Sequence, residues 1–157
     1  MMYSSNFVFI HVPRTGGTIL TDEFGSLDIV SKDVHSLKHA TASELQKIIE
    51  PAIWESAYKF SIHRSDDEIA ASWYKHLRYC FGEHNNGETL GVSQSWIDFV
   101  AEASQYTFAE LCDRYPPPTM AYYLDSPGID AISLPQARDR LRELCGLQNC
   151  KKDRYCR

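Results

Sequence analysis

The sequence lacks the features that would tie it to a membrane, to nucleic acid or to secretion. No apolar run among its 157 residues approaches the ~20 residues of a membrane span, and the first residues lack the basic-then-apolar order of a signal peptide. The formal net charge of −5 leaves no basic excess for general nucleic-acid binding. We therefore expect a cytoplasmic protein with neither a membrane nor a nucleic acid as its partner.

Cysteine is also sparse, and its spacing fits no zinc motif. The number of cysteines is odd, which favours free thiols in a reducing cytoplasm over a disulfide framework. The five are Cys80, Cys112, Cys145, Cys150 and Cys156. No set of His and Cys residues has metal-ligand spacing, so we expect no bound metal.

What is present is typical of one α/β domain over residues 1–157. The chain is 43% hydrophobic and 24% charged, and at this length it can bury roughly two-thirds of its unfolded surface. Strands are expected at residues 7–10, 27–30, 58–63 and 129–133. Helices are expected at residues 17–24, 41–49, 135–145 and from 65 or 66 onward, with shorter ones within 94–103 and 107–115. This alternation indicates a central, mainly parallel sheet flanked by helices.

Local patterns mark the ends and faces of some elements. Thr41 stands three residues before Glu44, which predicts a capping box. A stripe of apolar residues at a spacing of four predicts the buried face of the helix after residue 65; it consists of Ile69, Trp73 and Leu77. Residues 82–89 are expected to form a loop, and the prolines at 116–118 to end a helix.

The segment FVFIHVPRTGGTIL, residues 7–20, places flexible and cationic residues directly after an apolar strand. Gly16 and Gly17 allow the backbone to approach an anion closely, and unpaired amides at the start of the next helix can bind it. Threonine hydroxyls add donors, and Arg14 adds a permanent positive charge. The order differs from the Walker pattern, in which Lys follows the glycines of a longer loop. The alternative is a plain Gly-Gly turn with an incidental Arg.

The segment FSIHRSDDEIAASWYKH, residues 60–76, suggests a second anion site. Arg64 follows a predicted strand, and Ser72 lies on the predicted helix after it. A guanidinium and a hydroxyl brought together there suit a separate phosphate. The alternative is that Arg64 caps the sheet edge and Ser72 is a small residue packed between helices.

Together the two segments resemble motifs of the cytosolic and Golgi-type sulfotransferases that use 3′-phosphoadenosine-5′-phosphosulfate (PAPS). FIHVPRTGGTIL is similar to the 5′-phosphosulfate loop of that superfamily, and FSIHRSDDEIAASWYKH to its 3′-phosphate motif. The intervening SLKHATASELQKIIEPAIWESAYKF resembles the carbohydrate-type branch. The resemblance covers about residues 6–80 and implies a three-layer, P-loop-like fold in a single sulfotransferase-like domain.

The resemblance also implies a reaction and a site. The sulfuryl group of PAPS would move to a hydroxyl acceptor, a carbohydrate or another small molecule, by in-line displacement, leaving 3′-phosphoadenosine-5′-phosphate (PAP) and requiring no metal. Arg14 would stabilise charge on the leaving phosphate, while Arg64 and Ser72 would hold the 3′-phosphate. The residues implied in binding the donor are Arg14, Thr15, Gly16, Gly17, Thr18, Ile19, Arg64 and Ser72.

Catalysis by this route needs a base for the acceptor hydroxyl, and the ordinary pKa of histidine suits that role. His39, directly before ATASEL, matches the position that the resemblance gives to the base. His35 and His11 are the alternatives. Of the other histidines, His63 is expected to be structural, and His76 and His84 to lie at the surface.

The chain departs from the family pattern at two places. Arg14 stands where the family usually has Lys, and an Arg cannot donate a proton, so turnover would be slower or the protein would be a non-catalytic PAPS- or PAP-binding module. Family members often continue through a basic segment, and Lys151 and Lys152 either begin such a segment or belong to a charged tail. A P-loop kinase is the remaining alternative, although it would need a Lys after the glycines and acidic ligands for magnesium.

Overall fold

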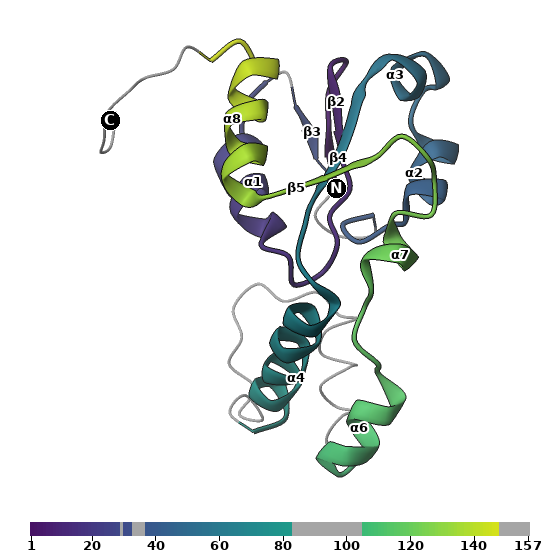
Figure 1. Cartoon of the computed structure of the whole chain (residues 1–157), viewed down its shortest axis with the longest axis vertical. Coiled ribbons are helices and arrows are strands. Elements are labelled where there is room, and N and C mark those ends of the chain that lie inside the picture. Colours follow the sequence, from purple (N-terminus) through teal and green to yellow (C-terminus); the bar gives the residue numbers. More distant parts are fainter. Residues whose placement is uncertain (29, 33–36, 83–104, 148–157) are drawn as a thin grey trace, which may run out of the picture.

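Five short strands form a single sheet in the order β3-β1-β2-β4-β5. They are β1 (Met2–Tyr3), β2 (Phe7–Phe9), β3 (Ser31–Lys32), β4 (Tyr58–Ile62) and β5 (Asp130–Ile132). β2, β4 and β5 run parallel, whereas β1 pairs antiparallel with both β2 and β3. The structure is a computed structural model that describes residues 1–28, 30–32, 37–82 and 105–147 (Figure 1). The mixed α/β class expected from the sequence is confirmed.

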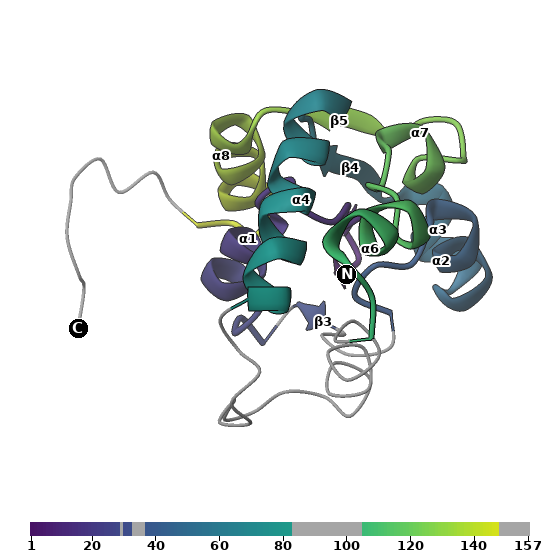
Figure 2. The same cartoon turned by 90° about the horizontal axis from the view of Figure 1, so that it is seen from below.

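Helices cover both faces of this sheet. They are α1 (Gly17–Phe24), α2 (Ala42–Ile48), α3 (Pro51–Ser56), α4 (Asp66–Gly82), α6 (Phe108–Arg114), α7 (Met120–Tyr123) and α8 (Leu134–Leu144). Figure 1 shows α1 and α8 on one side of the strands and α2 and α3 on the other. α4 and α6 lie side by side beyond the carboxyl ends of β2 and β4, as both Figure 1 and Figure 2 show. In the described part of the chain, no helix is long and apolar enough to span a bilayer.

The sheet has a separate core on each face because side chains alternate along β2. Phe7 and Phe9 pack on the side of α1 and α8, and Val8 and Ile10 pack on the side of α2 and α3. The first core also contains Leu20, Phe24, Phe60, Ile62 and Leu141. The second contains Ala42, Leu45, Ile49 and Trp54. Both faces of β2 are therefore buried, as its unbroken apolar sequence predicts.

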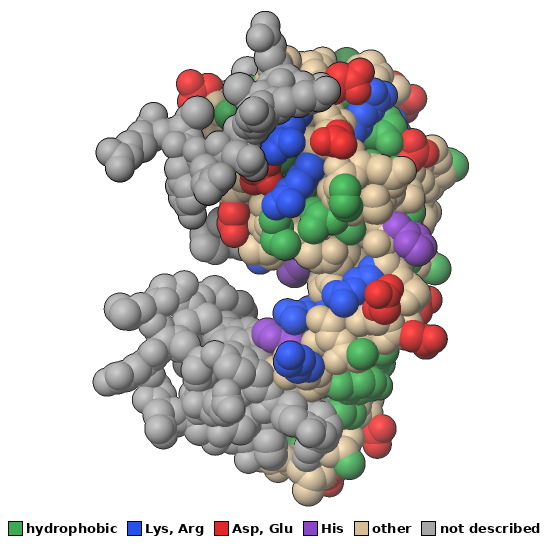
Figure 3. Space-filling view, turned by 60° about the vertical axis from the view of Figure 1, so that its left-hand side comes forward, with side chains coloured by type: hydrophobic (Ala, Val, Ile, Leu, Met, Phe, Trp, Pro, Cys, Tyr) green, Lys and Arg blue, Asp and Glu red, His purple; other side chains and the backbone are tan. Residues whose placement is uncertain are grey.

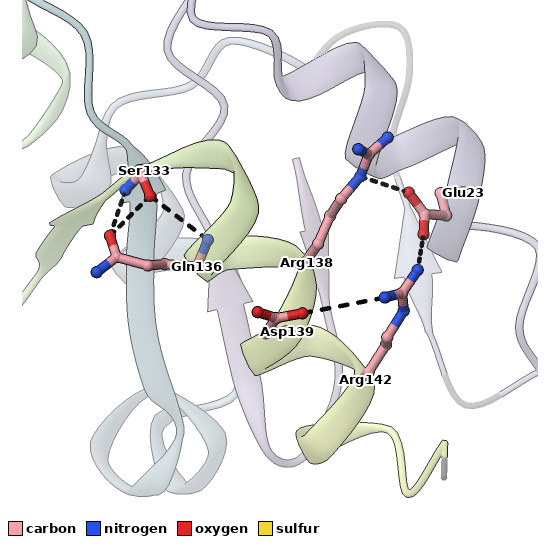
Figure 4. A network of polar contacts seen from close by, with 6 residues as sticks. All are labelled: Glu23, Ser133, Gln136, Arg138, Asp139 and Arg142. Atoms are coloured by element: carbon pink, nitrogen blue, oxygen red, sulfur yellow. Dashed lines mark hydrogen bonds and ion pairs between the residues drawn. The ribbon is translucent and has the colours of Figure 1, made fainter. Parts of the chain in front are cut away.

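Polar contacts set the position of α8 (Figure 4). Ser133 and Gln136 form a capping box at its N-terminus. Glu23 on α1 accepts from Arg138 at 2.8 Å and from Arg142 at 3.1 Å. Exposed ion pairs of this kind contribute at most about 1 kcal/mol each. Their main effect is to fix the orientation of α8 against α1.

Most predicted elements are confirmed. α1 matches the helix predicted at residues 17–24, the capping box of Thr41 and Glu44 opens α2, and β2, β4, β5, α6 and α8 correspond to other predicted elements. Ile69 and Leu77 are fully buried, as the stripe predicts. No helix is present at the prolines 116–118, between α6 and α7. The helix predicted within 94–103 and nearly all of the predicted loop 82–89 lie outside the described residues.

The strand predicted at residues 27–30 is wrong for the described residues of that segment, which are 27, 28 and 30. The amide of Val30 donates to the carbonyl of Leu27 at 2.9 Å, and both side chains pack against the core beneath α1 and α8. Strand pairing begins only afterwards, at β3. Apolar side chains in a segment that covers a core produce the same short pattern as a buried strand.

Candidate functional site

The loop between β2 and α1 contains a strained residue. Arg14 has φ 67° and Gly16 has φ 95°, and both angles are left-handed. Glycine adopts this conformation at little cost, whereas a residue with a Cβ is strained there by roughly 1–2 kcal/mol. The Thr15 hydroxyl closes the loop by donating to the Val12 carbonyl at 2.8 Å. Strain of this kind in a loop held by its surroundings is typical of functional sites.

Gly17 is required by close packing. A Cβ at this position would lie 2.4 Å from Cδ2 of His11 and 2.8 Å from Cζ of Phe9. The His11 ring is only 2% exposed and stacks on the ring of Phe9, with the two centroids 5.7 Å apart. The first residue of α1 therefore lies directly against the end of β2, and this contact sets where the helix begins.

The loop also presents free backbone donors. Within the described part of the chain, no group accepts a hydrogen bond from the amides of residues 14–18. The start of a helix leaves amides unpaired, and the helix dipole favours a negative charge beside them. These amides, in a turn at residues 13–16 and at the start of α1, are donors that a bound anion could use.

Arg14, Arg64 and Ser72 lie together. Nε of Arg14 donates to Oγ of Ser72 at 3.0 Å, and Nη1 of Arg64 donates to the backbone carbonyl of Arg14 at 2.7 Å. These contacts join residues 58 and 50 positions apart in the sequence. They form because β2 and β4 are parallel neighbours. The segments that follow the two strands therefore leave the sheet side by side, at the carboxyl ends of the strands. The two predicted anion sites are thus parts of one polar network.

A pocket of about 550 Å³ opens beside this network. It is lined by Arg14, Arg64, Glu68, Ala71, Ser72, Lys75 and His76. Three of these side chains are cationic, and the single carboxylate, that of Glu68, already accepts a hydrogen bond from the Ser65 hydroxyl at 2.9 Å. Figure 3 shows Lys, Arg and His side chains gathered in the lower half of the view, over the region of α4. The pocket suits a phosphate group, which Arg binds through paired hydrogen bonds.

Sequence reasoning missed four residues of this pocket, namely Glu68, Ala71, Lys75 and His76. His76 was expected at the surface, but it is half-buried and lines the pocket with Lys75. Burial lowers the pKa of His76, and the charge of Arg14 lowers it further, so the imidazole is neutral near pH 7. Lys75 and His76 follow Ser72 at a spacing of three and four. That spacing places residues on one face of a helix and could have identified both.

His39 lies in a different pocket, of about 410 Å³. Its Nδ1 is 3.0 Å from the carbonyl oxygen of His11 and carries the hydrogen in this contact, because a carbonyl can only accept. Nε2 is then the nitrogen with a lone pair, which is the form that a general base needs. Although His39 is exposed overall, its ring packs against that of His11 with the centroids 4.7 Å apart. This partial burial lowers the pKa of His39, although the hydrogen bond to His11 acts in the opposite direction.

His11 is a buried residue that packs on Phe9. Burial lowers its pKa to about 3, and the neighbouring His39 and Lys38 and the chain's amino group act in the same direction. Its Nδ1 is buried and has no hydrogen-bond partner among the described residues. The ring is therefore neutral, and its backbone carbonyl orients His39.

The other predicted residues differ in how exposed they are, and some lie outside the described residues. Thr18 and Ile19 are exposed, whereas Thr15 is buried and its hydroxyl donates to the Val12 carbonyl inside the loop. The participation of these residues in donor binding stays a prediction. His63 is exposed. His35, His84, Lys151 and Lys152 lie outside the described residues.

Among the described residues, no group of three or more His, Cys, Asp or Glu side chains could hold a metal ion. Cys112 and Cys145 are free thiols. The absence of a metal from the reaction stays a prediction.

Comparisons with protein-family models, with curated proteins and with solved structures give no match to this chain.

Proposed function

We propose that the protein is a PAPS-dependent sulfotransferase of P-loop-like fold that sulfates a hydroxyl acceptor. One observation carries the proposal: Arg14, Arg64 and Ser72, drawn from two segments that resemble the donor motifs, meet at one cationic pocket. A pocket with three cations and several free amides nearby is suited to a ligand with phosphate groups at two positions.

In this proposal Arg14 and the amides of residues 14–18 bind the 5′-phosphosulfate. Arg64 uses one N–H on the Arg14 carbonyl and keeps others for the 3′-phosphate, beside the hydroxyl of Ser72. The guanidinium of Arg14 stabilises the charge that develops on the phosphate and does not donate a proton to it, because its pKa is too high.

The transfer itself is an in-line displacement. The acceptor oxygen forms a bond to the sulfuryl sulfur as the bond from sulfur to the bridging oxygen breaks. That electron pair remains on the phosphate of PAP, and Nε2 of His39 takes the hydroxyl proton. Positioning and charge stabilisation supply most of the rate enhancement, as in phosphoryl transfer.

Nucleotide binding tests the donor assignment directly. Calorimetric titration with PAP, and separately with ATP and magnesium, is expected to give tighter binding of PAP. Saturating EDTA is expected to leave PAP binding and transfer from labelled PAPS almost unchanged. Tighter binding of ATP with magnesium, or activity that EDTA removes and magnesium restores, would favour the kinase instead.

A second function, a non-catalytic PAP-binding module, is favoured by one observation. His39 is not among the residues that line the arginine pocket. If it cannot reach an acceptor held near the donor, binding would occur without transfer. An acceptor-library assay with labelled PAPS distinguishes the two, since the module would bind PAP and sulfate none of the acceptors.

A further inference from the structure

Two further pockets share a wall, and the first of them adjoins the β2–α1 loop through Pro13. One, of about 360 Å³, is lined by Pro13, Trp73, Pro116, Pro117, Pro118, Thr119, Tyr122 and Tyr123. The other is the His39 pocket, lined also by Leu37, Ala40, Thr41, Glu44, Ile48 and the same two tyrosines. The shared wall is α7. We refer to the first as the proline-aromatic pocket.

Hydrogen bonds hold the walls of these pockets together. The amide of Met120, at the start of α7, donates to Asp66 at the start of α4, at 3.1 Å. Just beyond α7, Asp125 accepts from the amide and the hydroxyl of Ser43 on α2, at 2.9 and 2.6 Å. α7 is thus attached to helices on both sides, and Nε1 of Trp73 is held by the Tyr115 carbonyl at 2.8 Å.

Charge is distributed very unevenly among the three pockets. The arginine pocket contains Arg14, Arg64 and Lys75. Among the described residues that line the other two pockets there is no Lys or Arg, and the one carboxylate is that of Glu44. Within these linings an anionic polysaccharide would meet the carboxylate of Glu44 and no Lys or Arg; the charge of Lys38 acts on His39 but Lys38 is not a lining residue.

The lining suits the face of a ring. Indole, phenol and pyrrolidine groups offer flat apolar surfaces, and the polar edges of tyrosine can bond to hydroxyl groups. Tyr122 is 64% exposed, and its ring stands edge-on to that of Tyr123 at 5.0 Å between centroids, so its outer face is available to a ligand.

We propose that the proline-aromatic pocket and the His39 pocket together bind an uncharged, ring-bearing alcohol, a neutral glycoside or a phenol, as the acceptor. That the bound alcohol is a sulfate acceptor rests on the proposed function, whereas the binding of the alcohol does not. Pro13 in one pocket directly precedes Arg14, and His39 lies in the other, so an acceptor across α7 lies between the donor loop and the base. The aromatic lining favours an uncharged ring over a sulfated or carboxylated polysaccharide as the acceptor.

The test measures binding apart from turnover. Saturation-transfer NMR with 4-nitrophenyl β-galactoside and with 2-naphthol is carried out on the full chain, with and without PAP. Tyr122→Ala is expected to weaken binding of whichever probe binds by at least about tenfold, the effect of losing one well-packed aromatic contact. Tyr74→Ala is the matched control, because Tyr74 is 37% exposed on α4 and lines none of the three pockets.

The outcomes separate this inference from the proposed function. Equal binding by wild type and Tyr122→Ala, binding of neither probe, or tighter binding of chondroitin sulfate would overturn the acceptor site. A protein that binds a neutral probe in a Tyr122-dependent way but does not bind PAP would support the site and refute the sulfotransferase proposal. Transfer from PAPS to the neutral probe, with KM raised in Tyr122→Ala, would support both.

Discussion

Nη1 of Arg64 donates a 2.7 Å hydrogen bond to the backbone carbonyl of Arg14. The residue that receives this bond is the one with the left-handed backbone, φ 67°. Arg64 therefore holds a strained loop in place in addition to the phosphate contact proposed for it. The two segments that resemble donor motifs act as one unit.

Replacement of Arg64 tests this double role. Arg64→Ala is expected to weaken PAP binding by about 2–4 kcal/mol, because a charge-assisted contact and the loop support are both lost. ATP lacks the 3′-phosphate and should lose much less. Calorimetric titration of both nucleotides gives the comparison.

Arg64→Lys serves as the control. It keeps the charge but cannot bond the Arg14 carbonyl and a phosphate with one planar fork, so we expect an intermediate affinity for PAP. Equal losses for PAP and ATP in Arg64→Ala would show that Arg64 supports the loop and does not contact the 3′-phosphate.

The packing of Gly17 predicts a large effect from one methyl group. Gly17→Ala is expected to lower the free energy of unfolding by about 1–3 kcal/mol, because the new Cβ would overlap His11 and Phe9. Urea unfolding measures the change. The double variant with His11→Ala should lose less than the sum of the two single losses, since the alanine leaves room for the methyl group. Simple additivity would contradict the contact.

The buried His11 ring makes stability depend on pH. Its pKa is about 3 in the folded protein and 6.5 as a free side chain, so below pH 6.5 the unfolded chain takes up a proton that the folded chain does not. The contribution of the neutral His11 ring to the free energy of unfolding is therefore complete above pH 6.5 and is lost as the pH falls. We expect it to contribute a loss of about 2 kcal/mol in unfolding free energy between pH 7 and pH 5.

His11→Gln provides the comparison for this pH effect, because its amide does not titrate. The stability of the variant, measured by urea unfolding, should fall less steeply over the same pH range. Parallel profiles for the two proteins would mean that other groups cause the loss.

If His39 is the general base, the rate of sulfuryl transfer depends on pH. His39→Ala is expected to slow transfer by about 10²–10⁴-fold, as removal of a general base does, with little change in PAP affinity. The neutral imidazole is the active form and its pKa is lowered, so the wild-type rate should fall only below pH 6.5. Single-turnover transfer from PAPS across pH measures this. His63→Ala is the control, because His63 is exposed at the end of β4, and an equal loss there would contradict the assignment.

Local chemistry explains which elements could be predicted. The helix at residues 17–24 and the cap of Thr41 depend on neighbours within one or two turns, so their signals are contained in the sequence. β1, by contrast, has only two residues, which is too short for any periodicity, and forms because Met2 and Tyr3 pair with β2. Pairing between distant segments leaves no local pattern.

The candidate site likewise has residues that the sequence indicated and contacts that it did not. Arg14, Arg64 and Ser72 could be selected by type and by their positions after strands. The direct bond from Arg14 to Ser72, 58 residues apart, could not be predicted, because it depends on the left-handed turn at Arg14 and on the parallel pairing of β2 with β4. His76 shares a face of α4 with Ser72, a relation that its spacing could have shown, but its burial beside Arg14 depends on a distant segment and leaves no local pattern.

The crossover between β2 and β4 makes ligand binding a measure of complete folding. Arg14 follows β2, Arg64 follows β4, and α2 and α3 are inserted between the two strands. The arginine pocket therefore forms only when that whole segment has folded, and a ligand in it binds the native state alone. At roughly 100 times its Kd such a ligand adds about 2.7 kcal/mol to the free energy of unfolding. If the proposed donor is that ligand, its supply would set how long the protein survives proteolysis.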